Sequence, residues 1–216
     1  NGTLLSLIDQ LLVHHSLSTE EYVYLLQNRT AEAAALLADD AVRERKRIYG
    51  NEVFTRGLIE ISNICRNDCL YCGLRRSNSC LTRYRLTEEE IAACAEEGYG
   101  LGFRTFVLQG GEDPFFTDEV LCRVVRRLKK EHPDCVVTLS MGERTRESYQ
   151  RLYDAGADRY LLRHETADQA HYEKLHPPEM SFEHRMECLH TLREIGYQVG
   201  CGFMVGSPYQ IGRASC

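Results

Sequence analysis

From residue 53 onward, short apolar runs alternate with amphipathic stretches of helical period, and this alternation limits the possible folds more than any other feature of the chain. Strands that alternate with helices favour a parallel sheet joined by right-handed crossovers. The sequence therefore predicts an α/β fold, a partial TIM-type (βα) barrel of about five units. Its strands are expected at residues 54–62, 103–108, 136–140, 159–163 and 197–205, with helices that begin near Thr87, Asp118, Thr145 and Ser181.

The segment before this sheet has a different pattern. Leucine and isoleucine recur at helical spacing near the start, and Ser18 with Glu21 forms an S-x-x-E capping box. We expect an N-terminal helical segment over residues 1–52, the partial barrel over residues 53–210 and an atypical tail over residues 211–216. Because the chain begins at Asn1 without an initiator methionine, we also expect a fragment of a longer protein that lacks three βα units and is not fully competent.

Three cysteines follow the first predicted strand in a C-x3-C-x2-C run, Cys65, Cys69 and Cys72. Three thiolates on one short loop can bind three irons of a 4Fe-4S cluster, whereas four cysteines usually hold such a cluster. The fourth iron then keeps an open coordination position, which is typical of a reactive site. The alternative is a four-cysteine zinc site completed by Cys80, but Cys80 lies in a polar loop with no second cysteine beside it.

Polar residues gather where the predicted strands end. The reactive loops of a parallel barrel follow the carboxyl ends of its strands. Arg163 and Glu165 share one strand face, and paired charges on a buried strand are costly unless a partner or ligand neutralises them. A polar interior cavity is therefore expected, with solvated strand ends as the other interpretation. Arg56 and Glu60 likewise share a face of the first strand. The residues at the strand ends are Gly110, Gly111, Glu112, Asp113, Thr138, Ser140, Arg163 and Glu165.

Composition excludes several classes of partner. The 216 residues carry a net charge of -6 without a basic block, which argues against a nucleic-acid or anionic-membrane surface. No apolar run approaches the length of a membrane span, and the amino end lacks the regions of a signal peptide. We expect a cytoplasmic protein that acts on a small molecule.

Four stretches together resemble one family. Residues 63–76, 84–87, 107–113 and 157–166 are similar to the radical S-adenosylmethionine (SAM) enzymes and, in the detail of Cys-Leu-Tyr-Cys-Gly-Leu-Arg-Arg and Leu-Leu-Arg-His-Glu-Thr, to the FeFe-hydrogenase maturase HydE family. The likeness extends from about residue 53 to residue 206. Methylornithine synthase (PylB) and biotin synthase, which share fold and cofactors, remain alternatives, as does a zinc-stabilised fragment without catalytic activity.

The resemblance implies two cofactors, a 4Fe-4S cluster and SAM, and assigns residues to them. Cys65, Cys69 and Cys72 match the cluster ligands, and Tyr71 matches an aromatic residue that packs beside SAM. Arg56 matches an arginine that faces substrate carboxylates inside the barrel. The other positions implied to line the SAM cavity are Gln109, Gly110, Gly111, Glu112, Asp113, Thr138, Ser140, Arg163, Glu165, Arg185 and Met204.

The implied reaction is reductive cleavage of SAM to methionine and a 5'-deoxyadenosyl radical, in assembly of the hydrogenase H-cluster. The cofactors carry the difficult chemistry and the protein orients them. The implied partners are a small iron- or cysteine-derived substrate, an electron donor such as ferredoxin or flavodoxin, and other hydrogenase maturases.

Overall fold

A computed structural model describes residues 2–207, which form two compact units, one ending at Phe54 and the other beginning at Thr55. The tail expected at residues 211–216, and residues 208–210 of the expected barrel segment, lie outside the described residues.

The first unit consists of three helices, α1 (Gly2–His14), α2 (Thr19–Gln27) and α3 (Ala31–Tyr49). The capping box predicted before α2 is present, because the Ser18 side chain accepts a hydrogen bond from the Glu21 amide and Glu21 caps Ser18 in return. Apolar side chains from all three helices form a small core: Leu4, Ile8, Leu25 and Ala33.

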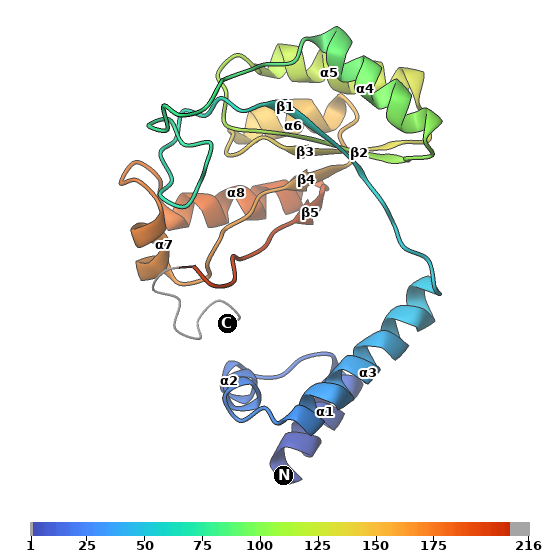
Figure 1. Ribbon diagram of the computed structural model, residues 1–216, viewed down its shortest axis with the longest axis vertical. Coiled ribbons are helices and arrows are strands. Elements are labelled where there is room, and N and C mark those ends of the chain that lie inside the picture. The colour runs from blue at the N-terminus through green and yellow to red at the C-terminus, as the bar shows by residue number, and fades with distance from the viewer. Residues whose placement is uncertain (1, 208–216) are drawn as a thin grey trace. The chain divides into compact units, whose positions relative to one another are not determined.

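The second unit is built on a five-stranded parallel sheet in the order β1-β2-β3-β4-β5 (Figure 1). The predicted α/β class and the number of strands are confirmed. The strands are β1 (Gly57–Ser62), β2 (Thr105–Gly110), β3 (Val136–Ser140), β4 (Arg159–Leu161) and β5 (Gln198–Gly200).

Several strand boundaries differ from the prediction. The third strand agrees, but β1 begins three residues later, at Gly57, and β2 is displaced by two residues because the amide of Phe103 still bonds the carbonyl of Gly98 at the end of the preceding helix. The two last strands are shorter than predicted. Beyond β4, Glu165 has φ +64, outside the extended region. Beyond β5 a single bridge, Glu165 to Phe203, continues the pairing.

Four helices, α4 (Glu88–Gly100), α5 (Asp118–Glu131), α6 (Arg146–Asp154) and α8 (Phe182–Ile195), cover one face of the sheet (Figure 1). A hydroxyl residue caps each of them, and Thr87, Thr145 and Ser181 are the residues at which helices were expected to begin. A short helix between β4 and α8, α7 (Gln169–Leu175), was not predicted.

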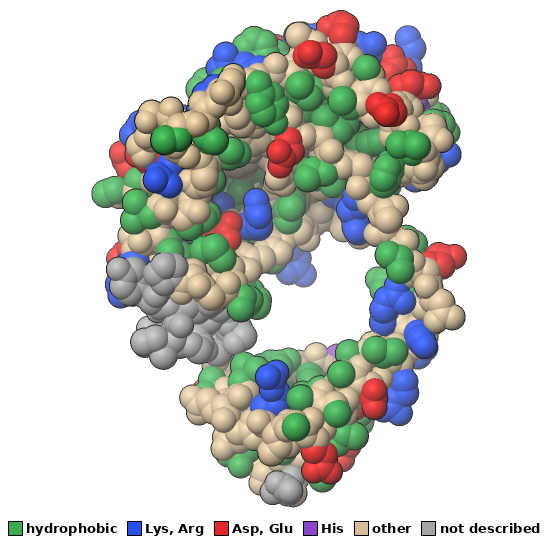
Figure 2. Space-filling view, in the orientation of Figure 1, with side chains coloured by type: hydrophobic (Ala, Val, Ile, Leu, Met, Phe, Trp, Pro, Cys, Tyr) green, Lys and Arg blue, Asp and Glu red, His purple; other side chains and the backbone are tan. Residues whose placement is uncertain are grey.

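The main core lies between these helices and the sheet, and includes Ile59 and Ile61 of β1. The opposite face of β1 is open, since Leu58 is 54% exposed and Glu60 is exposed as well. On the face of this unit drawn in Figure 2, acidic and basic side chains are interspersed. Among the described residues, no helix is both long and apolar enough to cross a membrane.

Candidate active site

A cavity of about 160 Å³ lies at the carboxyl ends of the strands, where the sequence predicted a polar site. It is formed by the cysteine loop after β1, the loops after β2, β3 and β4, and the start of α8. A larger cavity of about 430 Å³ on the other side of Glu112 contains no cysteine. The residues that line the smaller cavity are Glu60, Ser62, Cys65, Asn67, Cys69, Tyr71, Cys72, Leu74, Gln109, Gly110, Gly111, Glu112, Ser140, Gly142, Leu161, Leu162, Arg163, Glu165, Met180 and Arg185.

The three motif cysteines are half-buried, and all of them face this cavity. The Cys65 sulfur accepts a hydrogen bond from the amide of Glu112 at 3.4 Å, and the Cys69 sulfur lies 3.6 Å from the thioether of Met180. Burial raises the pKa of the Cys65 thiol, and raises that of Cys69 to about 11. These two thiols must lose their protons to bind metal.

Gly110 and Gly111 were expected to line the SAM cavity, and both line this cavity. The cysteine loop also approaches Gly111 closely. A methyl group there would lie 2.7 Å from Cβ of Cys65 and would clash with the carbonyl oxygen of Ile64. The missing side chain lets β2 and the cysteine loop pack in direct contact.

Glu112 and Asp113 were expected to line the SAM cavity, but protein partners already bind both carboxylates. Glu112 Oε2 accepts hydrogen bonds from Arg66 at 2.8 and 3.0 Å, and its Oε1 accepts one from the amide of Glu143 at 3.0 Å. Of these two residues, only Glu112 lines the cavity.

Asp113 is buried and clamps the end of the cysteine loop to β1. Its carboxylate accepts hydrogen bonds from Arg85 at 2.7 and 2.9 Å and from the Ser62 hydroxyl at 2.7 Å. Burial opposes ionisation of Asp113, but the bonds from Arg85 and Ser62 outweigh it and hold the pKa of the carboxyl below its usual value. Asp113 therefore supports the conformation of the loop.

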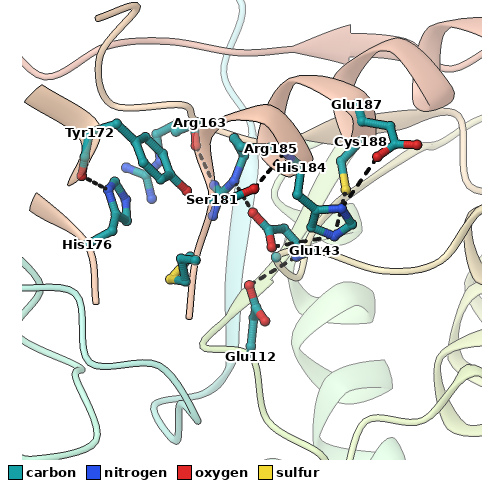
Figure 3. Close-up of polar contacts among 12 residues, drawn as sticks. Glu112, Glu143, Arg163, Tyr172, His176, Ser181, His184, Arg185, Glu187 and Cys188 are labelled. Carbon is teal, nitrogen blue, oxygen red and sulfur yellow. Dashed lines mark hydrogen bonds and ion pairs between the residues drawn. The ribbon is translucent and has the colours of Figure 1, made fainter. Parts of the chain in front are cut away.

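A buried ion pair between Arg185 of α8 and Glu143 of the loop after β3 lies beside the cavity (Figure 3). Arg185 Nε lies 2.5 Å from Glu143 Oε1, and the same guanidinium donates to the carbonyl oxygen of Arg163 at 2.6 Å. Burial opposes the charge on Arg185, but Glu143 outweighs it, so the pKa of Arg185 is raised. With the bond from the Glu143 amide to Glu112, these contacts join the loops after β2, β3 and β4 to α8.

Arg163 and Glu165 both reach the cavity, but from the loop after β4 and not from the strand itself. Their closest charged atoms are 3.8 Å apart, and the Glu165 side chain is only 12% exposed whereas that of Arg163 is 55% exposed. The structure thus places a buried carboxylate and an accessible guanidinium side by side at the cavity edge.

Besides Asp113, three expected site residues do not line this cavity. Arg56 precedes β1 at the end of the sheet opposite the cysteines, is exposed, and borders a separate pocket beside Leu58. Thr138 is buried one alternation below Ser140 in β3, and the backbone amide of Met204 bonds the carbonyl oxygen of Glu165. The substrate role expected for Arg56 therefore has no support from its position in this unit.

Three residues near the cysteines were missed by the sequence analysis: Glu143, His176 and Met180. Glu143 lies three residues beyond the end of β3. Because reactive loops follow strand ends, inspecting this whole loop for charged residues would have found it. His176 and Met180 lie between α7 and α8, in a stretch where no element was predicted. Their contacts with the cysteine loop depend on tertiary packing and have no local pattern.

Comparison with known proteins identifies the class. Residues 59–211 match the model of the radical SAM superfamily, so the chain belongs to this superfamily. Its members use a 4Fe-4S cluster together with SAM.

Among its relatives, the chain is 50% identical to the [FeFe] hydrogenase maturase subunit HydE of Thermotoga maritima, over 83% of this chain and 50% of that protein. It is 30% identical to the 3-methylornithine synthase of Methanosarcina acetivorans, over 92% of this chain and 56% of that protein. The chain thus spans about half the length of the curated relatives it matches. The crystal structure of methylornithine synthase (PylB) superposes with a TM-score of 0.85 at 28% identity, covering 96% of this chain and 61% of PylB.

The donor set fits the cluster of this superfamily. In a cubane cluster each thiolate binds its own iron, so the three sulfurs have no need to converge on one point. Among residues 2–207, no three His, Cys, Asp or Glu side chains are grouped closely enough to hold a single metal ion. Cys80, the fourth ligand of the zinc alternative, is exposed and is not among the residues that line the cavity.

Proposed function

We propose that this chain forms the SAM-cleaving part of an FeFe-hydrogenase maturase. One observation carries the proposal: the three motif thiols open onto the same cavity as Arg163, Glu165 and Arg185. A cluster with one open iron, bound there, would lie next to groups able to hold the charged ends of SAM. The 50% identity to HydE, against 30% to 3-methylornithine synthase, favours the maturase over the synthase.

In this proposal the residues of the chain bind the cluster and SAM, orient them and shield them from solvent. Cys65, Cys69 and Cys72 would hold the cluster, and the bound cluster and SAM would supply reductive cleavage of a carbon-sulfur bond and abstraction of a hydrogen atom. Glu165 and Arg163 would bind polar groups of SAM, since a carboxylate accepts from hydroxyl or ammonium groups and a guanidinium donates to carboxylates. Tyr71, half-buried and lining the same cavity as Cys69, would pack against the cofactor.

The remaining cavity residues would complete the cofactor site. Gln109 donates to Glu60 at 3.5 Å, and Ser140 at the end of β3 lines the same cavity. We propose that Gly110 and Gly111 act indirectly, by letting the cysteine loop approach β2. The substrate would be a small iron- or cysteine-derived molecule, as in HydE-like maturation.

The proposal includes an electron donor such as ferredoxin or flavodoxin, and other hydrogenase maturases as partners. Residues 62–86, which contain the cluster ligands, include five arginines and one acidic residue, whereas the chain as a whole has a net charge of -6. A basic loop beside the cluster suits an acidic electron carrier. A cytoplasmic location belongs to the same proposal, because free cysteines persist in a reducing compartment.

SAM cleavage tests the proposed function. The chain would be reconstituted anaerobically with iron and sulfide, reduced, and supplied with SAM, and 5'-deoxyadenosine and methionine would be quantified. We expect both products from the wild type and neither from Cys69→Ala. A reconstituted protein with an intact cluster that binds SAM but never cleaves it would contradict the proposal. Ornithine-type products from a lysine substrate would favour the methylornithine synthase alternative.

A further inference from the structure

The last residue of α7 and the segment between α7 and α8 contact the cysteine loop at three consecutive residues. The Cys69 sulfur meets the Met180 thioether at 3.6 Å, and the Leu70 amide donates to the carbonyl oxygen of Leu175 at 2.9 Å. The Tyr71 hydroxyl lies 3.1 Å from Nε2 of His176. These contacts therefore hold the part of the loop that runs from Cys69 to Tyr71, directly before Cys72.

His176 is the most constrained member of the segment. Its Nδ1 lies 2.9 Å from the carbonyl oxygen of Tyr172, and because a carbonyl only accepts, Nδ1 must carry the hydrogen. In the neutral ring Nε2 is then an acceptor, so the Tyr71 hydroxyl donates to it. The imidazole also stacks on the Tyr172 ring at 3.7 Å and meets the Tyr71 ring edge to face at 5.3 Å.

Burial makes these contacts specific. His176 is 4% exposed and Tyr172 is fully buried, so neither can exchange its protein partner for water. The Tyr172 carbonyl fixes which nitrogen of His176 accepts, and the accepting nitrogen fixes the direction of the Tyr71 hydroxyl. Figure 3 shows His176 and Tyr172 side by side with their hydrogen bond.

We propose that His176 is a positioning residue that holds Tyr71, and with it the Cys69–Cys72 part of the loop, in the conformation that accepts cluster and SAM. Removing the acceptor would leave the Tyr71 hydroxyl without its partner and would free the ring to turn. The part of this inference that concerns SAM rests on the proposed function, whereas the part that concerns the loop does not.

The test uses five variants of the chain. His176→Phe keeps a ring but removes the acceptor, and His176→Gln restores an acceptor on a longer side chain. Tyr71→Phe removes the donor, and it is combined with His176→Phe in a double variant. His190→Phe makes the same change at an exposed position of α8 and serves as the control. Two quantities are measured: amide hydrogen exchange of residues 69–72 in the cluster-free chain, and the Kd of SAM in the reconstituted chain.

We expect His176→Phe and Tyr71→Phe each to speed exchange at the Leu70 amide and to weaken SAM binding by roughly 3- to 10-fold, the range that one hydrogen bond gives. The double variant should be no worse than either single variant, because both remove the same bond. His176→Gln should recover part of the loss, and His190→Phe should match the wild type.

Unchanged exchange in His176→Phe, or effects that add in the double variant, would overturn the inference. A wild-type chain that takes up no cluster would instead contradict the proposed function, and the exchange measurement would still decide the role of His176.

Discussion

Gly111 lies directly against Cys65, so closely that a methyl group on Gly111 would come within 2.7 Å of Cβ of Cys65. This contact joins the end of β2 to the first cysteine of the motif. Both partners have little freedom to move, because the Cys65 sulfur also accepts from the amide of Glu112 and the Arg66 amide bonds the carbonyl oxygen of Glu112. The position of the cysteine loop therefore depends on Gly111, in the loop after β2.

Gly111→Ala should displace the cysteine loop, because backbone and not a flexible side chain occupies the space. We expect a loss of roughly 1 to 3 kcal/mol in unfolding free energy, the usual cost of overpacking, and lower iron retention. Gly73→Ala is the matched control, since no atom lies within 4 Å of a methyl group at that position of the same loop. Equal iron content in the two variants would show that the contact is not needed.

Alanine at Cys65, Cys69 or Cys72 should abolish the 4Fe-4S absorption, because each thiolate is proposed to bind a different iron. Cys80→Ala should retain the cluster, since Cys80 is exposed and outside the cavity. Iron and sulfide analysis with visible absorption checks this. If Cys80→Ala lost its metal while a motif cysteine variant kept it, the zinc-site alternative would be favoured.

Glu143→Ala should destabilise the fold strongly, because it leaves the charge of Arg185 buried without a carboxylate. Removing one partner of a buried ion pair costs roughly 3 to 5 kcal/mol, to be measured by urea unfolding. Glu194→Ala is the control: it breaks the exposed pair with Arg146, and such pairs contribute about 1 kcal/mol or less. Similar losses of unfolding free energy in both variants would mean that the buried ion pair stabilises the fold no more than the exposed one.

Glu165→Ala and Arg163→Ala should each weaken SAM binding by roughly 1.5 to 3 kcal/mol, the scale of a charge-assisted hydrogen bond, while the cluster remains. Equilibrium titration of the reconstituted variants with SAM measures the effect. If both variants bind SAM like the wild type, these charges are merely solvated at the strand end.

His176 should make the stability of the cluster-free chain depend on acid. Burial lowers the pKa of His176 from 6.5 to about 4, so between these values the unfolded chain binds a proton that the folded chain does not. Its contribution is complete above pH 6.5 and is lost as the pH falls toward 4, up to roughly 3 kcal/mol. Urea unfolding at pH 7 and 4.5 should show a smaller difference in His176→Gln than in the wild type, and equal differences would contradict this.

The sequence predicted much of the fold, and the place of the cysteine loop after the first strand, because those signals are local. Helix caps such as Thr87 and Ser181, and the alternation of strands and helices, depend on near neighbours and were found. The left-handed conformation of Glu165, a non-glycine residue just beyond β4, had no local signal and was not predicted.

The site was harder to predict where partners come from distant segments. Asp113 was expected near a ligand, yet Arg85 and Ser62 occupy its carboxylate, and a motif cannot show which protein group reaches a carboxylate first. His176 was missed for a similar reason, since its bond to Tyr71 spans 105 residues.

Metal analysis of the anaerobically reconstituted wild-type chain, with electron paramagnetic resonance of the reduced protein before and after SAM, tests the central claim most directly. The account predicts about four irons and matching sulfide per chain, no zinc, and a signal that SAM changes because it binds the open iron. Stoichiometric zinc without visible absorption, or a cluster whose signal SAM leaves unchanged, would contradict it.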